Sequence, residues 1–475
     1  MQDEIVRGSC GPVALKTTLG YVLSGPLFQS ENTETTLTTC CLRVNVEDQL
    51  DRVVEKLWKL DGVSTKDDDD NDVLKKFQES ITFNELSGRY QVHLPWRQDV
   101  GTLCDNYSQC YRRLSNQLNR FQKNPELFDE YNKVMQEQID SGVLESVSTT
   151  PPGVGEAYYI PHHCVLRRDH TTTRLRVVYD ASSKLVGPSL NQCLYEGPCL
   201  LPKLVRILMR FRCRKIGIVG DLEKAFLQVE VAKEDRNFLR TLWVKDFDPR
   251  KSIELGKRPE ILVLRFSRVV FGVRSSPFHL SATFRYHAEK YREKYAHVVQ
   301  ELIDAMYVDD FESEADSVEE GYELFVTARK ISKEGGWNLR KFATNSRQLQ
   351  DRIDADFPEL ANDMPTNSAD DISFSEVTQP SYEVTQSNRE QKVLGMVWDK
   401  ATDTFVYRFD TFLSYSKSTA LTKRGLLQLL ARVYDPLGLI SPIMVALRCT
   451  FQQVCKLGIG WDDDVPAAQK FTIRK

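Results

Sequence analysis

The stretch that decides the fold is Ala305-Met306-Tyr307-Val308-Asp309-Asp310, a short apolar run that ends in two adjacent aspartates. Such a run is typical of a strand, and the aspartates would then lie at a hairpin tip. A second apolar run, 216–219, leads to Asp221. An isolated Asp-Asp pair is usually a turn or surface feature. Paired carboxylates joined by a third from a neighbouring strand, however, provide the oxygen ligands that two hard divalent cations require.

Further sequence blocks accompany these aspartates in a fixed order over about 89–400. Together they resemble the reverse transcriptases of long-terminal-repeat retroelements, and most closely those of the Bel/Pao group. The blocks are Arg176-Val177-Val178-Tyr179-Asp180, Asp221-Leu222-Glu223-Lys224-Ala225-Phe226, Phe271-Gly272-Val273-Arg274-Ser275-Ser276-Pro277, Tyr307-Val308-Asp309-Asp310, Asn338-Leu339-Arg340-Lys341 and Val393-Leu394-Gly395-Met396.

The resemblance implies an RNA-directed DNA polymerase that transfers nucleotides from a dNTP to a primer 3′-hydroxyl. Tyr307-Val308-Asp309-Asp310 is similar to the family's metal-binding motif, and Asp221 is similar to the metal-binding aspartate of its first palm motif. The resemblance therefore implies that Asp221, Asp309 and Asp310 are catalytic and hold two Mg²⁺ or Mn²⁺ ions. The implied partners are an RNA or DNA template-primer and dNTP.

The same resemblance implies a set of nucleotide-binding residues. A guanidinium meets phosphate oxygens with two donors and stays charged, which suits the triphosphate contact implied for Arg176. Phe226 takes the place of the family's steric gate against a ribose 2′-hydroxyl; its alternative is an ordinary core residue. The remaining implied contacts are Arg168 (or its neighbour Arg167) for the triphosphate, Phe271 and Gly272 for the nucleotide pocket, Lys341 for the leaving pyrophosphate and 393–396 for the primer-grip hairpin.

Charge is distributed unevenly along the chain. The 475 residues carry a net charge of −4, yet residues 151–300 contain 27 Lys and Arg against 15 Asp and Glu. A basic middle in an acidic chain is expected where one module meets a phosphate backbone. The alternative is an ordinary solvated face. The candidate nucleic-acid-binding residues are Lys203, Arg206, Arg210, Arg212, Arg285 and Lys290, with Arg214 and Lys215 beside them.

The predicted architecture is an α+β right-hand polymerase with fingers, a ferredoxin-like palm and a thumb or connection region. Residues 1–30 resemble the end of a retroelement protease domain, and the acidic 31–88 is predicted to be a linker. Fingers and palm occupy 89–400, with the fingers over roughly 125–215 and a polar loop at 346–390. Residues 401–475 are predicted to be thumb and connection, ending before any ribonuclease H domain, so that the chain would be a fragment or a degenerate copy.

Several other interpretations remain open. Asp140-Ser141-Gly142 spells the aspartic-protease triplet, but it is predicted to end a helix that begins after Asn124-Pro125. A catalytically inactive retroelement remnant that still binds nucleic acid is the main alternative, and an RNA-dependent RNA polymerase shares the metal chemistry. Glu312 and Glu314 replace the apolar residues expected after the aspartates, so they would either perturb the metal site or face solvent.

The sequence gives no sign of membrane insertion. The first ten residues carry no apolar core, and no window reaches eighteen apolar residues. We therefore predict no membrane partner and an intracellular, cytoplasmic location, with virus-like particles as an alternative within it.

Overall fold

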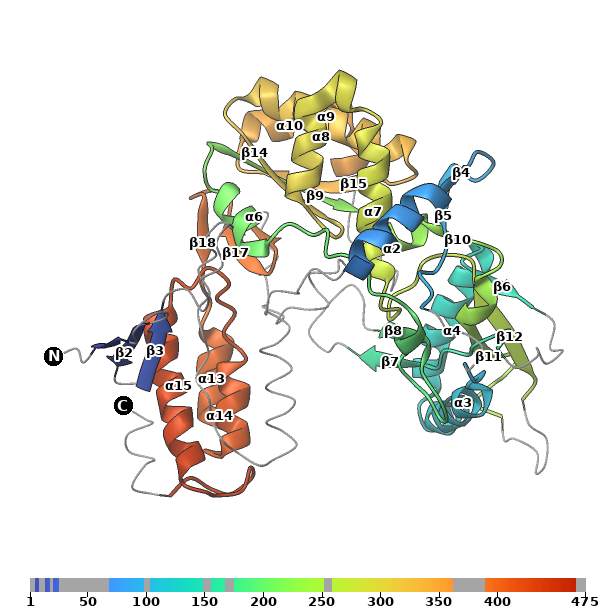
Figure 1. Ribbon diagram of the computed structural model, residues 1–475, viewed down its shortest axis with the longest axis horizontal. Helices are drawn as coiled ribbons and strands as arrows, with labels where there is room; N and C mark the ends of the chain where they lie inside the picture. The colour runs from blue at the N-terminus through green and yellow to red at the C-terminus, as the bar shows by residue number, and fades with distance from the viewer. Residues whose placement is uncertain are drawn as a thin grey trace. The chain divides into compact units, whose positions relative to one another are not determined.

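The computed structural model describes residues 5–7, 13–17, 20–24, 68–97, 103–147, 155–166, 175–251, 259–361 and 389–466. The chain divides into two units. The first combines 1–66, 419–430 and 440–475, and the second combines 67–418 and 431–439. Helices and strands are mixed throughout the second unit (Figure 1), which confirms the predicted α+β class.

The two aspartate-bearing runs lie in one four-stranded sheet of the second unit. Its strands are β9 (Ile216–Leu222), β13 (Met306–Tyr307), β14 (Asp310–Ala315) and β15 (Leu339–Thr344). Their spatial order is β13-β14-β9-β15, with helices between β9 and β13 and between β14 and β15. This order matches a ferredoxin-like βαββαβ fold, so the predicted palm is confirmed.

One face of the palm sheet is covered by helices. They are α8 (Arg292–Ala305) and α9 (Val318–Glu334), and α7 (Ser276–Glu289) packs against both of them. Figure 1 shows α8 and α9 beside β9 and β14. Ile218 and Phe311 of the sheet share the main core with Leu302 and Phe325 of these helices. The Ser317 hydroxyl accepts the Glu320 N–H at 3.2 Å, which is a helix N-cap.

The opposite face of the sheet packs against a helix and a hairpin. The helix is α6 (Leu204–Arg210), and the strands are β16 (Glu390–Val393), β17 (Met396–Asp399) and β18 (Thr404–Val406). Val219 and Ala343 of the sheet form a second core with Leu208 of α6 and with Met396 and Trp398 of β17. Residues 393–396 therefore form a hairpin, as their resemblance implied. Helix α13 (Asp410–Ser418) follows β18.

A second layered region includes most of the segment predicted to be the fingers. It contains α3 (Tyr107–Lys123), α4 (Pro125–Asp140), β6 (Leu144–Ser146), β7 (His162–Leu166), β8 (Leu175–Tyr179), β11 (Arg240–Val244) and β12 (Ile261–Phe266). Strands β11, β12 and β6 form one sheet, and β7 and β8 form another. The Asn124 side chain caps α4 as predicted. Because Asp140 is the last residue of α4, its Asp-Ser-Gly triplet lies at a helix end, as predicted.

Two segments that were predicted to lack regular secondary structure contain helices. Helix α2 (Asp68–Ser80) lies in the predicted linker, because Val73, Phe77 and Ile81 recur at helical spacing and are buried. The acidic residues at its start also favour the helix, since its N-terminus carries partial positive charge. Helices α10 (Arg347–Asp356) and α11 (Pro358–Ala361) likewise replace part of the predicted 346–390 loop. Residues 362–388 lie outside the described residues.

Short elements connect these layers. Strands β4 (Thr82–Asn84), β5 (Arg89–Val92) and β10 (Glu230–Val231) form a small sheet. Helix α5 (Leu190–Cys193) and the 3₁₀ helices Ala225–Gln228 and Arg236–Leu239 are further short elements of the second unit.

The adjacent histidines of β7 differ in burial, because neighbouring strand residues point to opposite faces. His162 is buried and His163 is exposed.

The first unit contains a sheet and two helices. Its strands are β1 (Ile5–Arg7), β2 (Val13–Thr17) and β3 (Gly20–Ser24), and its helices are α14 (Lys423–Leu430) and α15 (Ser441–Lys456). Leu426, Val454 and Val465 form its small core. In the described part of the chain, no helix combines the length and apolar character needed to cross a membrane.

Candidate active site

The pairing of β9 with β14 brings two of the three predicted catalytic aspartates together. Asp310 lies directly opposite Asp221 in the antiparallel register. Asp309 occupies the turn between β13 and β14, and its carbonyl oxygen accepts the Leu222 N–H at 2.8 Å. The three aspartates are only 8%, 4% and 9% exposed for Asp221, Asp309 and Asp310. Asp221 and Asp310, 89 positions apart in the sequence, are therefore brought to facing positions in a buried part of the sheet.

The turn itself has an unfavourable backbone conformation. Val308 has a φ of 61°, a region that β-branched residues rarely adopt. Such a conformation costs on the order of 1–3 kcal/mol and persists only where the surroundings fix it. Here the Asp309–Leu222 backbone hydrogen bond and the burial of Val308 fix it. The strain accompanies the placement of Asp309 and Asp310 at the hairpin tip.

Two cations of β15 lie beside Asp221. Lys341 Nζ is 3.3 Å from Asp221 Oδ2, and Arg340 Nε is 3.9 Å from the same oxygen. Adjacent strand residues normally point to opposite faces. The φ of 52° at Lys341 and the register shift after Arg340 interrupt that alternation. Arg340, only 2% exposed, was not among the predicted site residues. Its adjacency to Lys341 was the only available signal.

The donor set suits hard divalent cations. Among the described residues, no three His, Cys, Asp or Glu side chains form a ready-made chelating cluster. Asp221 and Asp310 nevertheless present carboxylates from facing positions of two strands. Magnesium-type ions commonly bind one or two carboxylates and keep phosphate and water as their other ligands. The residues present are therefore compatible with ions that arrive together with a nucleotide.

Glu312 and Glu314 do not face solvent, so that alternative is wrong. Glu312 is 3% exposed, and burial, followed by the charge of Asp310, raises its carboxyl pKa well above the ordinary value. Glu314 accepts the backbone N–H groups of Cys213 and Arg214 at 3.1 and 2.9 Å. Both glutamates are buried because helices cover one face of β14 and α6 with the 390–406 strands covers the other.

The predicted nucleotide-binding residues have mainly internal contacts in this structure. The buried ring of Phe226 packs on that of Phe271, with ring centroids 4.4 Å apart. Gly272 has a φ of 95°, and a Cβ atom there would lie 2.1 Å from the Tyr179 carbonyl oxygen. Its close backbone approach is therefore to the end of β8, the strand that carries Arg176. Arg167 and Arg168 lie outside the described residues.

Several predicted nucleic-acid-binding cations already have protein partners. Arg210 contacts Glu301 at 2.7 Å and Asp304 at 3.6 Å, and Arg206 lies 3.7 Å from Asp304. Charged partners of this kind make the surface mixed in sign rather than a continuous basic strip. The other contacts are Arg212 with Asp403, Arg214 with Glu320, Arg285 with the Leu200 carbonyl oxygen and Lys290 with the Tyr90 hydroxyl.

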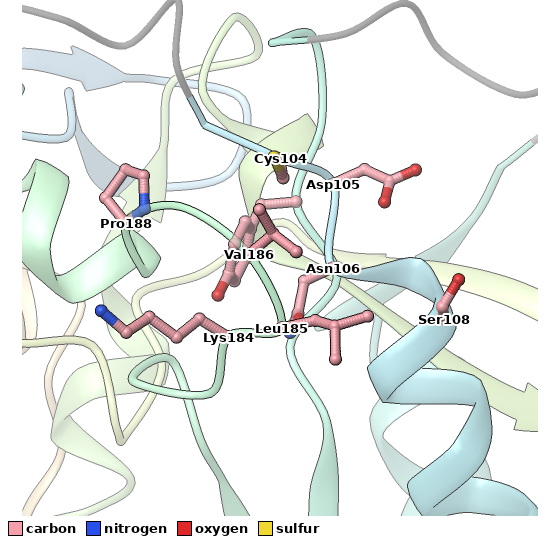
Figure 2. A pocket seen from close by; sticks show the side chains of 9 residues that line it. Cys104, Asp105, Asn106, Ser108, Lys184, Leu185, Val186 and Pro188 are labelled. Atoms are coloured by element: carbon pink, nitrogen blue, oxygen red, sulfur yellow. The ribbon is translucent and has the colours of Figure 1, made fainter.

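A separate cavity of about 170 Å³ opens beside the start of α3. Figure 2 shows Ser108 at the start of α3 and the loop 184–188 among its walls. Asp105 and Cys104 also contribute to it. None of the predicted site residues is among those that line it, so this cavity is not the acidic site.

Comparison with known proteins supports part of the predicted relation to retroelements. Residues 422–475 match the family described as Pao retrotransposon-like RNaseH-like domain. No curated protein matches the chain. Two similar solved structures are a foamy viral protease-reverse transcriptase dRH in complex with ds DNA and a foamy viral protease-reverse transcriptase in complex with RNA/DNA hybrid.

Both structural likenesses are distant. The first has a TM-score of 0.47 and 12% identity, covering 98% of this chain and 67% of that chain. The second has a TM-score of 0.44 and 12% identity, covering 99% of this chain and 53% of that chain.

The family match bears on the predicted C-terminal region. Residues 401–475 were predicted to be thumb and connection, ending before any ribonuclease H domain, and the family that matches 422–475 is named for an RNaseH-like domain. The same match is to a Pao retrotransposon family, the group that the polymerase motifs resemble. Over residues 422–475 the predicted resemblance to a Bel/Pao-type retroelement is thereby confirmed.

Proposed function

We propose that this chain is an RNA-directed DNA polymerase that extends a primer 3′-hydroxyl with dNTP on an RNA or DNA template. The observation that carries the proposal is the register that sets Asp310 opposite Asp221 at the end of the β9–β14 pair. Buried like charges are costly unless a cation compensates them. Their presence at adjacent strand positions is the arrangement expected of a metal-dependent phosphoryl-transfer site. The proposed location is the cytoplasm.

In this proposal Asp221, Asp309 and Asp310 hold two Mg²⁺ or Mn²⁺ ions. Such ions activate the attacking hydroxyl and neutralise the charge that develops on the triphosphate. The protein fixes the carboxylates by strand pairing and by the Asp309–Leu222 hydrogen bond. Lys341, 3.3 Å from Asp221, supplies a further positive charge on the same side of the sheet. It is proposed to stabilise the departing pyrophosphate.

The nucleotide would bind between the palm and the strand β8. Arg176 and Arg168 are proposed to contact the triphosphate, and Phe226 to lie beneath the sugar. The support for this role of Phe226 is that its ring packs against the ring of Phe271, which holds the Phe226 side chain in one position. Gly272 is proposed to keep the backbone of this pocket close to β8.

The template-primer is proposed to contact cations that lack an internal carboxylate partner in preference to those that have one. Lys203 is exposed at the start of α6, whereas Arg210 on the same helix contacts two carboxylates. Breaking those contacts would cost energy that phosphate binding would have to repay. Lys203 is therefore the stronger candidate on this helix.

Primer extension on a homopolymeric RNA template tests the proposal. The unmutated chain should incorporate dNTP in the presence of Mg²⁺ or Mn²⁺, and Asp309→Asn should not. Absence of incorporation by the unmutated chain, with template-primer binding retained, would instead identify an inactive remnant that binds nucleic acid.

Competition between dNTP and NTP tests the choice of sugar. The unmutated chain should prefer dNTP, and Phe226→Ala should weaken the preference because space opens beneath the ribose. Equal use of both nucleotides by the unmutated chain would contradict the role of Phe226 and favour an RNA polymerase.

A further inference from the structure

Helix α3 has one face in the protein core and one face in solvent. Its residues Cys110, Leu114, Leu118 and Phe121 recur at helical spacing and are buried. The opposite face is exposed and carries Ser108, Arg112, Asn116, Asn119, Arg120 and Lys123. Each of these six side chains can donate a hydrogen bond, and three of them are cations. The exposed face of α3 is therefore basic and rich in donors.

The cations of this face are not neutralised by the protein. Helix α3 contains four cations and neither Asp nor Glu. One of the four, Arg113, contacts Asp180 at 2.7 Å. In the part of the chain that the structure describes, no carboxylate lies within 4.0 Å of the side-chain nitrogens of Arg112, Arg120 or Lys123. Three cations are thus open to an anion from outside.

The neighbouring helix has the opposite charge and yet does not compensate them. Helix α4 follows α3 after a single residue and contains five acidic residues against one lysine. Its Asp129 contacts Arg250 at 2.5 Å, and its Glu137 contacts Lys133 at 4.0 Å. Among the described residues no ion pair joins α3 to α4. Soluble surfaces usually mix the two signs, and a surface of a single sign favours an oppositely charged partner.

The other residues of the face indicate which anion fits. Protein interfaces have an apolar and aromatic centre, whereas the exposed face of α3 has no large apolar side chain. Arg, Lys, Ser and Asn are the usual donors to nucleic-acid phosphates. Bound single strands also stack their bases on aromatic rings, but Tyr107 and Tyr111 pack against the main core. The face therefore fits the phosphate backbone of a duplex.

The helix is long and firmly held enough for several phosphate contacts. At 1.5 Å per residue, Arg112 and Lys123 lie about 16 Å apart along the axis, which corresponds to about five phosphates of one duplex strand. The Gln117 side chain donates to the His162 carbonyl oxygen, and Arg113 contacts Asp180 beside β8. These two contacts fix α3 while its opposite face stays exposed.

We propose that Arg112, Arg120 and Lys123 form a duplex-binding surface on α3, separate from the acidic site, and that they contact successive phosphates of one strand. Asn116 and Asn119 add neutral donors between the cations. This inference rests on the nucleic-acid binding in the proposed function and not on catalysis. Unlike Arg210 and Arg212, which contact carboxylates, these three cations need not give up a partner to bind phosphate.

The test measures the affinity of the full chain for a continuous, blunt-ended DNA duplex by fluorescence anisotropy at several salt concentrations. The α3 variant combines Arg112→Ala, Arg120→Ala and Lys123→Ala. The control variant combines Lys330→Ala, Lys333→Ala and Arg347→Ala, which removes the same charge from exposed positions of α9 and α10. A further variant, Arg112→Lys with Arg120→Lys, keeps the charge.

The expected result is a change in salt dependence that is specific to α3. Each phosphate contact contributes about 0.9 to the slope of log affinity against log salt, so the α3 variant should lose about 3 from that slope. The control variant and the lysine variant should keep the slope of the unmutated chain. Melting temperatures should agree in all four proteins, because the changed side chains are exposed. An unchanged slope in the α3 variant, or an equal loss in the control, would overturn the proposal.

Two further ligands identify the partner. The α3 variant should lose more affinity for the duplex than for single-stranded DNA of equal length or for a polyglutamate peptide. A loss confined to the single strand or to the peptide would contradict duplex binding at this surface.

Primer extension separates this inference from the polymerase proposal. An unmutated chain that incorporates no dNTP, but whose slope falls in the α3 variant, would contradict the polymerase function alone. An unmutated chain that extends primers, but whose slope is the same in the α3 variant, would contradict the duplex-binding surface alone.

Discussion

Asp310 on β14 lies directly opposite Asp221 on β9, and both carboxylates are buried. Two like charges this close oppose each other, and Lys341 lies 3.3 Å from the Asp221 carboxylate. The fold therefore keeps a locally unfavourable arrangement in the palm sheet. Local arrangements that oppose stability are expected mainly at functional sites.

Asp310→Asn should separate activity from stability. Removing one charge relieves the repulsion with Asp221, so the melting temperature without divalent ions should rise or stay unchanged. Incorporation should fall about a thousandfold, because metal stabilisation is worth several kcal/mol. Added Mg²⁺ should raise the melting temperature of the unmutated chain and not that of the variant. Asp351→Asn on α10 is the exposed control. A lower melting temperature for Asp310→Asn would contradict the repulsion.

Lys341→Met should lower the free energy of unfolding by about 1 kcal/mol, because Asp221 loses a cation that is partly exposed to solvent. In an Asp221→Asn background the same substitution should have almost no effect, since the charge that Lys341 neutralises is gone. Urea unfolding of the four proteins gives this coupling directly. Equal effects of Lys341→Met in both backgrounds would show that the lysine does not act through Asp221.

Local sequence patterns predicted the strands that carry the three aspartates, whereas the burial of the residues around them depends on the tertiary fold. The apolar runs before Asp221 and Asp309 predicted two strand ends, but only strand pairing sets residue 310 opposite 221. Strand β14 reads as mostly polar, and yet every residue in it is buried, because both faces of the sheet are covered. The sequence pattern carries no information on that second layer.

The same limit explains why the ion pairs of the basic residues could not be predicted from the sequence. The spacing of Arg206 and Arg210 shows one charged helix face, but their partners Glu301 and Asp304 lie about a hundred positions later. Helix α2 was missed for a related reason. Its many aspartates conceal Val73 and Phe77, whose burial depends on contacts with distant parts of the chain.

Gly272→Ala should be strongly destabilising, by about 3 kcal/mol or more, since the new methyl group would meet the Tyr179 carbonyl oxygen in a strained backbone conformation. Gly142→Ala is the matched control. Gly142 has a similar φ of 70°, but nothing lies within 4 Å of its Cβ position, so only the conformational cost of about 1 kcal/mol should remain. Denaturant unfolding measures both. Similar losses for the two variants would show that the approach to β8 contributes nothing.

Lys203→Ala and Arg210→Ala should affect different properties, although both lie at α6. Lys203→Ala should weaken template-primer binding and reduce the slope of log affinity against log salt by about 1, with unchanged stability. Arg210→Ala should instead cost about 1–2 kcal/mol of stability, because Glu301 and Asp304 lose their partner. Anisotropy at several salt concentrations and urea unfolding give the two quantities. A salt slope that changes only in Arg210→Ala would reverse the assignment.

Part of the loss of folding stability at acid pH should come from His162. Burial lowers the pKa of this imidazole from 6.5 to about 4, and its Nε2 donates to the Leu242 carbonyl oxygen at 2.9 Å while Nδ1 contacts the Tyr131 hydroxyl. The unfolded chain therefore binds a proton that the folded chain excludes. The stability from the neutral ring is fully present above pH 6.5 and is lost as the pH falls towards 4, by up to roughly 1.4 kcal/mol for each pH unit. His162→Gln should reduce this slope in urea unfolding between pH 7 and 5, and the exposed neighbour His163→Gln should leave it unchanged. Equal slopes in all three proteins would mean that His162 does not titrate differently on folding.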